Sequence, residues 1–139
     1  MKMYYIYYTP FLNFLGCTVD LVENDPFYSA VITNKTLIDL YVANAKSLGV
    51  EFEDVDATKL TASTDMGNIS KIKPSIHPLY KIAVTGPNHT HEFTSGTGHP
   101  DNQLPTLNSA KAMAMTAIDV MCDPQLMVNV NNDFKQSTA

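Results

Sequence analysis

The clearest helical periodicity in the chain follows Asn34, a residue type that caps helices well. Apolar residues recur from there at helical spacing as far as Leu48. Gly49 comes next, where a helix often ends on a residue with positive φ. The sequence therefore predicts a helix over residues 35–48.

A second helix is predicted after Thr106, because a stripe of apolar side chains begins there at helical spacing. Its members are Leu107, Ala110, Met113, Ala114, Ala117, Ile118 and Met121. Asp123-Pro124 ends this helix, and a shorter, weaker one is predicted beyond it. The methionines at positions 113, 115 and 121 are expected in a core rather than in a metal site.

Three segments have the pattern of strands. Residues 18–23 alternate apolar and polar side chains, which predicts a half-buried strand. Short apolar stretches at 50–52 and 79–84 predict two more. The order of helix, glycine and strand at 35–52 favours an α/β class.

Two long polar loops, 54–78 and 85–105, separate these elements. Long irregular stretches in a domain are usually functional or disordered. All four histidines lie in or beside these loops, so the loops are the first place to look for chemistry: His77, His89, His91 and His99.

Composition narrows the class of protein. The chain has 139 residues, enough for one domain or part of a larger one, with a net charge of -5. This acidity, with no cluster of Lys or Arg, argues against nucleic acid as a partner. No apolar run reaches the roughly 20 residues of a membrane helix. Cys17 and Cys122 form no CxxC pair, and two thiols in a reducing cytoplasm are a plainer interpretation than one disulfide.

The N-terminal residues 1–14 are rich in aromatic side chains and stay unassigned. One hypothesis is a secretory or lipoprotein signal that ends at Leu15-Gly16-Cys17. Pro10 and Asn13 interrupt the apolar stretch, so a strand or an irregular chain start is the plainer alternative.

His89 and His91 are two residues apart and could chelate one ion if they lay on an extended segment. On an irregular loop only one of them need do so, and surface histidines are the simpler interpretation. Thr64-Asp65-Met66-Gly67-Asn68 is the second candidate, since its polar side chains could orient a ligand. Gly67 permits close backbone approach, and from the residues alone a plain Asx-type turn is the favoured interpretation.

Four motifs together resemble metallopeptidase family M-twenty, and most closely its animal dipeptidases of the β-alanyl-lysine type. They are Ser63-Thr64-Asp65-Met66-Gly67-Asn68-Ile69-Ser70, Pro74-Ser75-Ile76-His77-Pro78, His89-Thr90-His91-Glu92-Phe93 and Leu104-Pro105-Thr106-Leu107. The resemblance extends over roughly residues 16–134. It implies a zinc-dependent hydrolase that cleaves an amide bond in a small dipeptide or N-acyl amino acid.

The resemblance also implies a fold: an α/β catalytic domain around a mixed sheet, with a smaller inserted lid domain that often forms a homodimer. Residues 15–24 then correspond to the end of the lid, including its last strand. Residues 25–139 correspond to the C-terminal part of the catalytic domain.

In the family, two zinc ions activate a water molecule, and a separate Glu is the general base. His89, followed by Thr90 and Phe93, matches the last zinc ligand, whereas His91 falls on a position that is not a ligand. The segment around Asp65 resembles the lining of the substrate pocket, which implies substrate-binding roles for Thr64, Asp65, Gly67, Asn68 and His77.

The chain departs from the family because it has no early H-x-D motif and no Glu-Glu pair. His99-Pro100-Asp101 follows the last ligand and cannot be that motif. No catalytic base is therefore expected in this chain, and zinc binding by the chain alone is expected to be weak or absent. The alternatives are the C-terminal part of an active dipeptidase, an inactive fragment that acts by binding, and a small metal-binding module built on His89 and His91.

Overall fold

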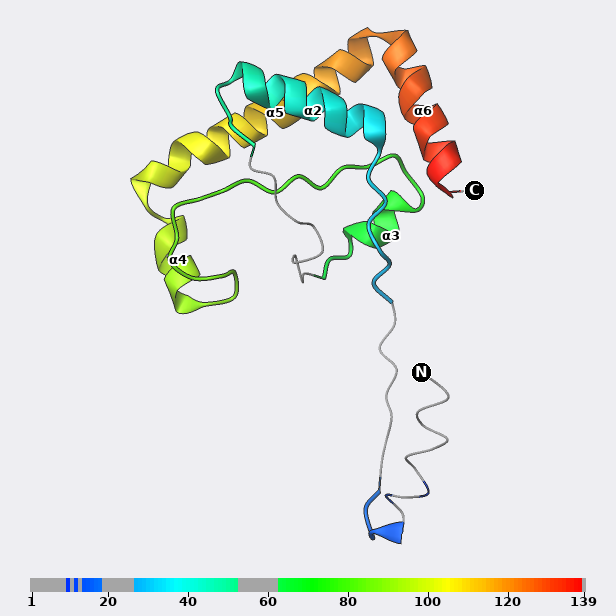
Figure 1. Ribbon diagram of the computed structural model, residues 1–139, viewed down its shortest axis with the longest axis vertical. Helices are drawn as coiled ribbons and strands as arrows, with labels where there is room; N and C mark the ends of the chain where they lie inside the picture. The colour runs from blue at the N-terminus through cyan, green and yellow to red at the C-terminus, as the bar shows by residue number, and fades with distance from the viewer. Residues whose placement is uncertain (1–9, 11, 13, 19–26, 53–62, 139) are drawn as a thin grey trace.

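The computed structural model describes residues 10, 12, 14–18, 27–52 and 63–138. Three longer helices, α2, α5 and α6, lie together, and an extended segment links the short helices α3 and α4 beside them (Figure 1). The helices are α2 (Lys35–Ser47), α3 (Met66–Ser70), α4 (His91–Thr97), the 3₁₀ turn η2 (Pro100–Asn102), α5 (Gln103–Cys122) and α6 (Pro124–Thr138).

Helix α2 begins and ends as predicted, to within one residue. The side chain of Asn34 accepts a hydrogen bond from the Leu37 backbone N–H at 3.1 Å and so caps the first turn. Gly49 has a φ of 80°, and its N–H donates to the Lys46 carbonyl at 3.0 Å. The Val50 N–H donates to the Ala45 carbonyl at 3.1 Å, which completes a Schellman ending.

Helix α5 starts at Gln103, a few residues before the predicted Thr106, because η2 leads directly into it. Its predicted end is confirmed. The Asp123 side chain accepts a hydrogen bond from the Gln125 N–H at 2.8 Å and caps the next helix, in which Pro124 is the first residue. Helix α6 has 15 residues and is longer than the short helix that the sequence predicts.

Small and polar side chains form the contact between α2 and α5. Tyr41 and Ala45 of α2 pack with Ala112 of α5 in the buried core. The Tyr41 hydroxyl lies 3.1 Å from the hydroxyl of Ser109, and the Asn44 amide donates to a carboxylate oxygen of α5 at 2.7 Å. The α5 side of this contact consists of small and polar residues, whereas α2 contributes the Tyr41 ring and Ile38 packs against the same cluster.

The prediction that the methionines of α5 lie in a core is wrong for two of them. Met113 is 41% exposed and Met121 is 72% exposed. The buried residues of α5 are Ala112, Thr116 and Val120, which lie toward α2. A pattern of apolar residues identifies a helix, but here the face that packs is the one with small side chains.

The strands predicted at 50–52 and 79–84 are not formed in the structure. A strand needs the backbone of a neighbouring strand as its partner. At Ala83 a side chain takes that place: the Ala83 N–H donates to Asn102 Oδ1 at 2.6 Å, and Asn102 Nδ2 donates to the Ala83 carbonyl at 3.3 Å. The strand predicted at 18–23 lies outside the described residues apart from Thr18, and the α/β class and the domain boundaries stay predictions.

No helix in the described ranges is both long enough and apolar enough to cross a membrane. Cys17 and Cys122 are both exposed free thiols.

Candidate functional site

Each of the two long polar loops contains a short helix that the sequence did not predict. Helix α4 starts after Thr90, whose hydroxyl accepts a hydrogen bond from the Phe93 N–H at 3.2 Å and donates to the Pro87 carbonyl at 2.7 Å. The rest of α4 is Thr-Ser-Gly-Thr, residues with weak helix propensity. Helix propensity alone disfavours this helix. The sequence signal that could have predicted it is Thr90, which caps its first turn.

His89 is the one described residue other than glycine that has a positive φ, at 69°. It lies exposed in the turn before Thr90. The left-handed conformation costs an ordinary residue on the order of 1 kcal/mol, and such strain is concentrated at functional positions. The backbone therefore sets His89 apart from the other described histidines.

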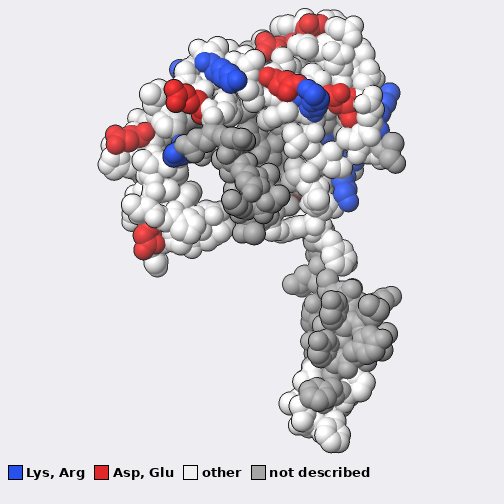
Figure 2. Space-filling model, viewed as in Figure 1, with Lys and Arg blue, Asp and Glu red and all other residues white. Residues whose placement is uncertain are grey.

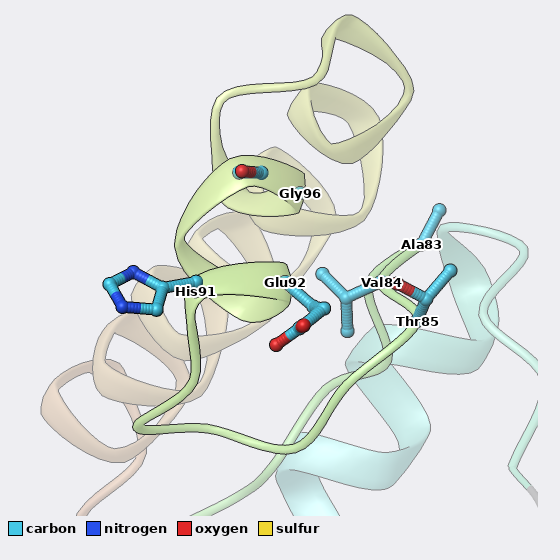
Figure 3. A pocket seen from close by; sticks show the side chains of 7 residues that line it. Ala83, Val84, Thr85, His91, Glu92 and Gly96 are labelled. Atoms are coloured by element: carbon cyan, nitrogen blue, oxygen red, sulfur yellow. The ribbon is translucent and has the colours of Figure 1, made fainter.

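His91 does not share the geometry of His89. It is the first residue of α4, and its imidazole points away from the side on which Glu92 lies (Figure 3). The extended segment that a joint chelate would need is absent, since Thr90 between them caps a helix and His89 is left-handed.

Gly67 allows the close backbone approach that the sequence predicts. A Cβ at this position would lie 1.6 Å from the carbonyl oxygen of Ser29. Asn68 Oδ1 accepts a hydrogen bond from the Ser29 N–H at 2.9 Å, and the Ser70 hydroxyl accepts one from the Ile32 N–H at 2.9 Å. In the structure, α3 is thus fastened to residues 27–32, and any role of Gly67 and Asn68 in substrate binding stays a prediction.

The other predicted pocket residues are spread along the chain. Thr64 accepts a hydrogen bond from the Met66 N–H at 3.2 Å, while Asp65 and His77 are exposed. Helices α3 and α4 lie at opposite ends of the extended segment that joins them (Figure 1). The structure therefore does not bring the Asp65 segment together with His89.

An open pocket of about 440 Å³ lies between residues 83–85 and helix α4. Its polar side chains are Thr85, His91, Glu92 and Ser95, of which sequence reasoning weighed only His91. The Glu92 side chain lies beside Val84 (Figure 3). The pocket therefore combines one carboxylate with two hydroxyl groups, a set that suits a ligand carrying hydrogen-bond donors.

Asn102 holds the two walls of this pocket together. Its amide donates to the Gly96 carbonyl at 2.7 Å in addition to its two bonds with Ala83. Gly96 is pressed against the opposite wall, since a Cβ there would lie 2.4 Å from Cγ1 of Val84. A single buried amide thus fixes the width of the pocket.

The charges on the surface are mixed. Lys and Asp or Glu side chains alternate over the face shown in Figure 2, without a large area of one sign. Away from the pocket, hydrogen bonds from the Thr36 hydroxyl and backbone N–H lower the pKa of Asp133. A hydrogen bond and ion pair with Asp39 raise the pKa of Lys35. The Thr36–Asp133 bonds join α2 to α6, whereas Lys35 and Asp39 form an exposed pair within α2, and none of these residues lines the pocket.

The described residues do not fit a zinc site on their own. Among them, no group of three or more His, Cys, Asp or Glu side chains is arranged to hold a metal ion. Zinc sites in proteins use at least three such ligands. The distance from His99 Nδ1 to Asp101 Oδ2 is 3.4 Å, but both side chains are exposed. His99 Nδ1 also accepts a hydrogen bond from the Asp101 backbone N–H at 3.3 Å.

Two known proteins match most of the chain. It is 45% identical to the Xaa-Arg dipeptidase of Mus musculus over 122 residues, which are 86% of this chain. It is 41% identical to the Xaa-Arg dipeptidase of Homo sapiens over the same length. The chain resembles an animal dipeptidase of the M-twenty type. The resemblance inferred from the four motifs is thereby confirmed.

The match covers only part of those dipeptidases. This chain spans 28% of the length of each relative. No protein-family model matches the chain. The match therefore does not by itself assign the activity of the whole relatives to this chain.

Proposed function

We propose that this chain forms part of a dipeptidase that hydrolyses the amide bond of a small dipeptide or N-acyl amino acid. The observation that carries the proposal is the identity of 45% and 41% to two dipeptidases over 86% of the chain. The strained backbone at His89, φ 69°, supports a functional role for the segment that precedes α4.

His89 is the residue that we propose as a zinc ligand. It is exposed, it follows a turn, and it matches the H-[ST]-x-x-F setting of the family through Thr90 and Phe93. Because the described residues hold no complete ligand group, the other ligands in this proposal lie outside them. Thr64, Asp65, Gly67, Asn68 and His77 remain the proposed lining for the substrate.

The proposed substrate has a basic C-terminal residue, as the names of both relatives indicate for those proteins. Glu92 is the acidic residue that lines the pocket, which Thr85 and Ser95 also line. A carboxylate can accept two parallel hydrogen bonds from a guanidinium group, which neutral side chains do less strongly. We therefore assign Glu92 to the recognition of the substrate's cationic side chain.

A chimera tests the proposal. The matched 122 residues of the mouse dipeptidase are replaced by those of this chain, and hydrolysis of an Xaa-Arg dipeptide is measured. We expect turnover by the chimera. His89→Ala should reduce kcat/KM on the order of a hundredfold or more, since loss of even an outer-shell partner of a metal ligand costs ten- to a hundredfold.

His91→Ala is the matched control, because His91 lies two residues away and is also exposed. It should keep most of the bound zinc and most of kcat, whereas a change in KM is expected because His91 lines the pocket that we assign to the substrate. Equal losses from the two substitutions would contradict the assignment to His89. A well-folded chimera that hydrolyses no dipeptide would contradict the proposed function.

Glu92→Gln tests the substrate. KM for an Xaa-Arg dipeptide should rise about tenfold or more, because the substitution removes one charge-assisted hydrogen-bonded pair with the substrate. KM for a dipeptide that ends in alanine should not change. A parallel rise for both substrates would show that Glu92 acts on the fold and not on the cationic side chain.

A second candidate is a binding module without turnover. It is favoured by the lack of a complete ligand group among the described residues and by the absence of a Glu-Glu pair from the sequence. The full chain alone, with added zinc, should then hydrolyse no dipeptide. Turnover by the isolated chain would overturn this candidate and also our inference that its catalytic base is missing.

A further inference from the structure

Helix α5 has apolar side chains on two opposite sides. The side toward α2 is formed by Ala112, Thr116 and Val120, which are buried. Residues two apart on an α-helix lie about 200° apart, so the neighbouring set points the other way. We call this set the outer face of α5, and it consists of Leu107, Ala110, Ala114, Ala117, Ile118 and Met121.

The outer face is exposed and carries no charge. Leu107 is 53% exposed, Ile118 is 54% exposed and Met121 is 72% exposed. The face runs from Leu107 to Met121, about 21 Å along the helix axis at 1.5 Å per residue. A continuous exposed apolar face on a helix marks an interaction site.

The described part of the chain has a small core of its own. Its buried apolar residues are five, whereas seventeen large apolar side chains are exposed, among them the three on the outer face. A protein of this size normally buries about two thirds of the surface of its unfolded chain. Such an excess of exposed apolar groups is typical of a surface that packs against further polypeptide.

We propose that the outer face of α5 is the surface on which the remaining part of a dipeptidase-like polypeptide packs. This inference rests on the proposed function. Its basis is the extent of the match: the chain spans 28% of each relative, so most of a relative has no counterpart here that could cover the face.

The dimensions of the outer face favour this occupant over a second copy of the chain. A strip about 21 Å long and about 10 Å wide offers roughly 200 Å² on each partner. A stable interface needs about 800 Å² from each side. A second copy paired along this strip alone would be unstable, whereas a longer polypeptide can also cover the other exposed apolar groups.

Site-specific labelling tests the inference with a substitution that is mild in the isolated chain. Ala117→Cys places a small thiol at the middle of the outer face, and Asn132→Cys places one on the exposed part of α6 as the matched control. Each variant is made in the full chain and in the chimera with the mouse dipeptidase. Labelling by iodoacetamide is read at each cysteine by peptide mass spectrometry.

We expect the Ala117→Cys thiol to react at least tenfold more slowly in the chimera than in the isolated chain. The Asn132→Cys thiol should react at similar rates in both. Equal labelling of Ala117→Cys in the two contexts would overturn the inference. A chimera without a cooperative melt would also overturn it, because this surface would then not fit the rest of the dipeptidase.

Three further outcomes are decisive. Slow labelling of Ala117→Cys in the isolated chain that becomes fast on dilution would show that a second copy covers the face, against the inference. Protection in a chimera that hydrolyses nothing would keep the docking surface and overturn the proposed function. Hydrolysis by a chimera in which Ala117→Cys is not protected would keep the proposed function and overturn the docking surface.

Discussion

The helices α2, α5 and α6 differ from residues 63–102 in how their positions are fixed. The helices are held by their own caps and by repeated contacts along their length, such as the pairing of α2 with α5 through Tyr41, Ala45 and Ala112. In residues 63–102, a few polar side chains bond backbone groups from distant segments. Asn68 and Ser70 hold residues 29 and 32, and Asn102 holds residues 83 and 96.

This difference shows where single residues matter most. In the helices, many weak contacts share the stabilisation, so that each can be lost at modest cost. In residues 63–102, one amide or one glycine holds a whole segment, and the candidate pocket depends on it. A substitution there should therefore alter the site as well as the stability.

The largest effect is expected at Gly67. In Gly67→Ala, a Cβ would lie 1.6 Å from the Ser29 carbonyl oxygen, so α3 must move away from residues 27–32. We expect a loss of about 3 kcal/mol in the free energy of unfolding, measured by urea denaturation. Gly98→Ala is the matched control, because a Cβ there meets nothing within 4 Å and φ is -82°. Equal losses from both would contradict the close contact.

The next largest effect is expected at Asn34, which belongs to the helices but joins three segments. Its side chain caps α2 and donates to the Val130 carbonyl at 2.9 Å, and its N–H donates to the Ser75 carbonyl. Asn34→Ala should lower the free energy of unfolding by about 2 kcal/mol, roughly 1 for each lost side-chain bond. Lys35→Ala, one residue further on and exposed, should change it by less than about 0.5 kcal/mol.

Asp133 gives a dependence on pH within the same helices. Hydrogen bonds from Thr36 lower its pKa in the folded state below the ordinary value of 3.8. The stabilisation is therefore complete above that value and is lost as the pH falls through the lower folded-state pKa. Between neutral pH and pH 3, the urea midpoint of the wild type should fall more than that of Asp133→Asn. Parallel curves for the two proteins would contradict this role of the carboxylate.

The smallest effect is expected at His89. His89→Gly removes the strain of the left-handed backbone, so the free energy of unfolding should stay the same or rise by about 0.5 kcal/mol. His91→Gly, inside α4, should lower it by about 0.5 to 1 kcal/mol, because glycine is a poor helix former. Both shifts can be read by urea denaturation. A destabilised His89→Gly would contradict backbone strain as the main contribution of this position to stability.

The sequence predicted the helices well because their signals are local. Asn34, Gly49 and Asp123-Pro124 act within a few residues of the helix ends that they define. The buried face of α5 could not be predicted in this way, since small side chains, not the apolar stripe, face α2. Strands at 50–52 and 79–84 depend on a distant backbone partner, which a local pattern does not contain.

The candidate site was predictable only in part. The motif around His89 identified the residue that has a strained backbone, but helix α4 and the pocket beside it were missed. Glu92 and Ser95 line the pocket only because α4 turns them toward residues 83–85. The resemblance to dipeptidases implies a zinc site, but the described residues do not contain a complete set of zinc ligands.

The burial of Asn34 has a further consequence for covalent modification. Asn34-Lys35-Thr36 and Asn88-His89-Thr90 both have the sequence of an N-glycosylation acceptor. The Asn34 side chain is 3% exposed and its Nδ2 donates to the Val130 carbonyl, so a sugar could be attached only before α2 and α6 come together. Asn88 is exposed in a turn, and a glycan there would stand directly beside His89.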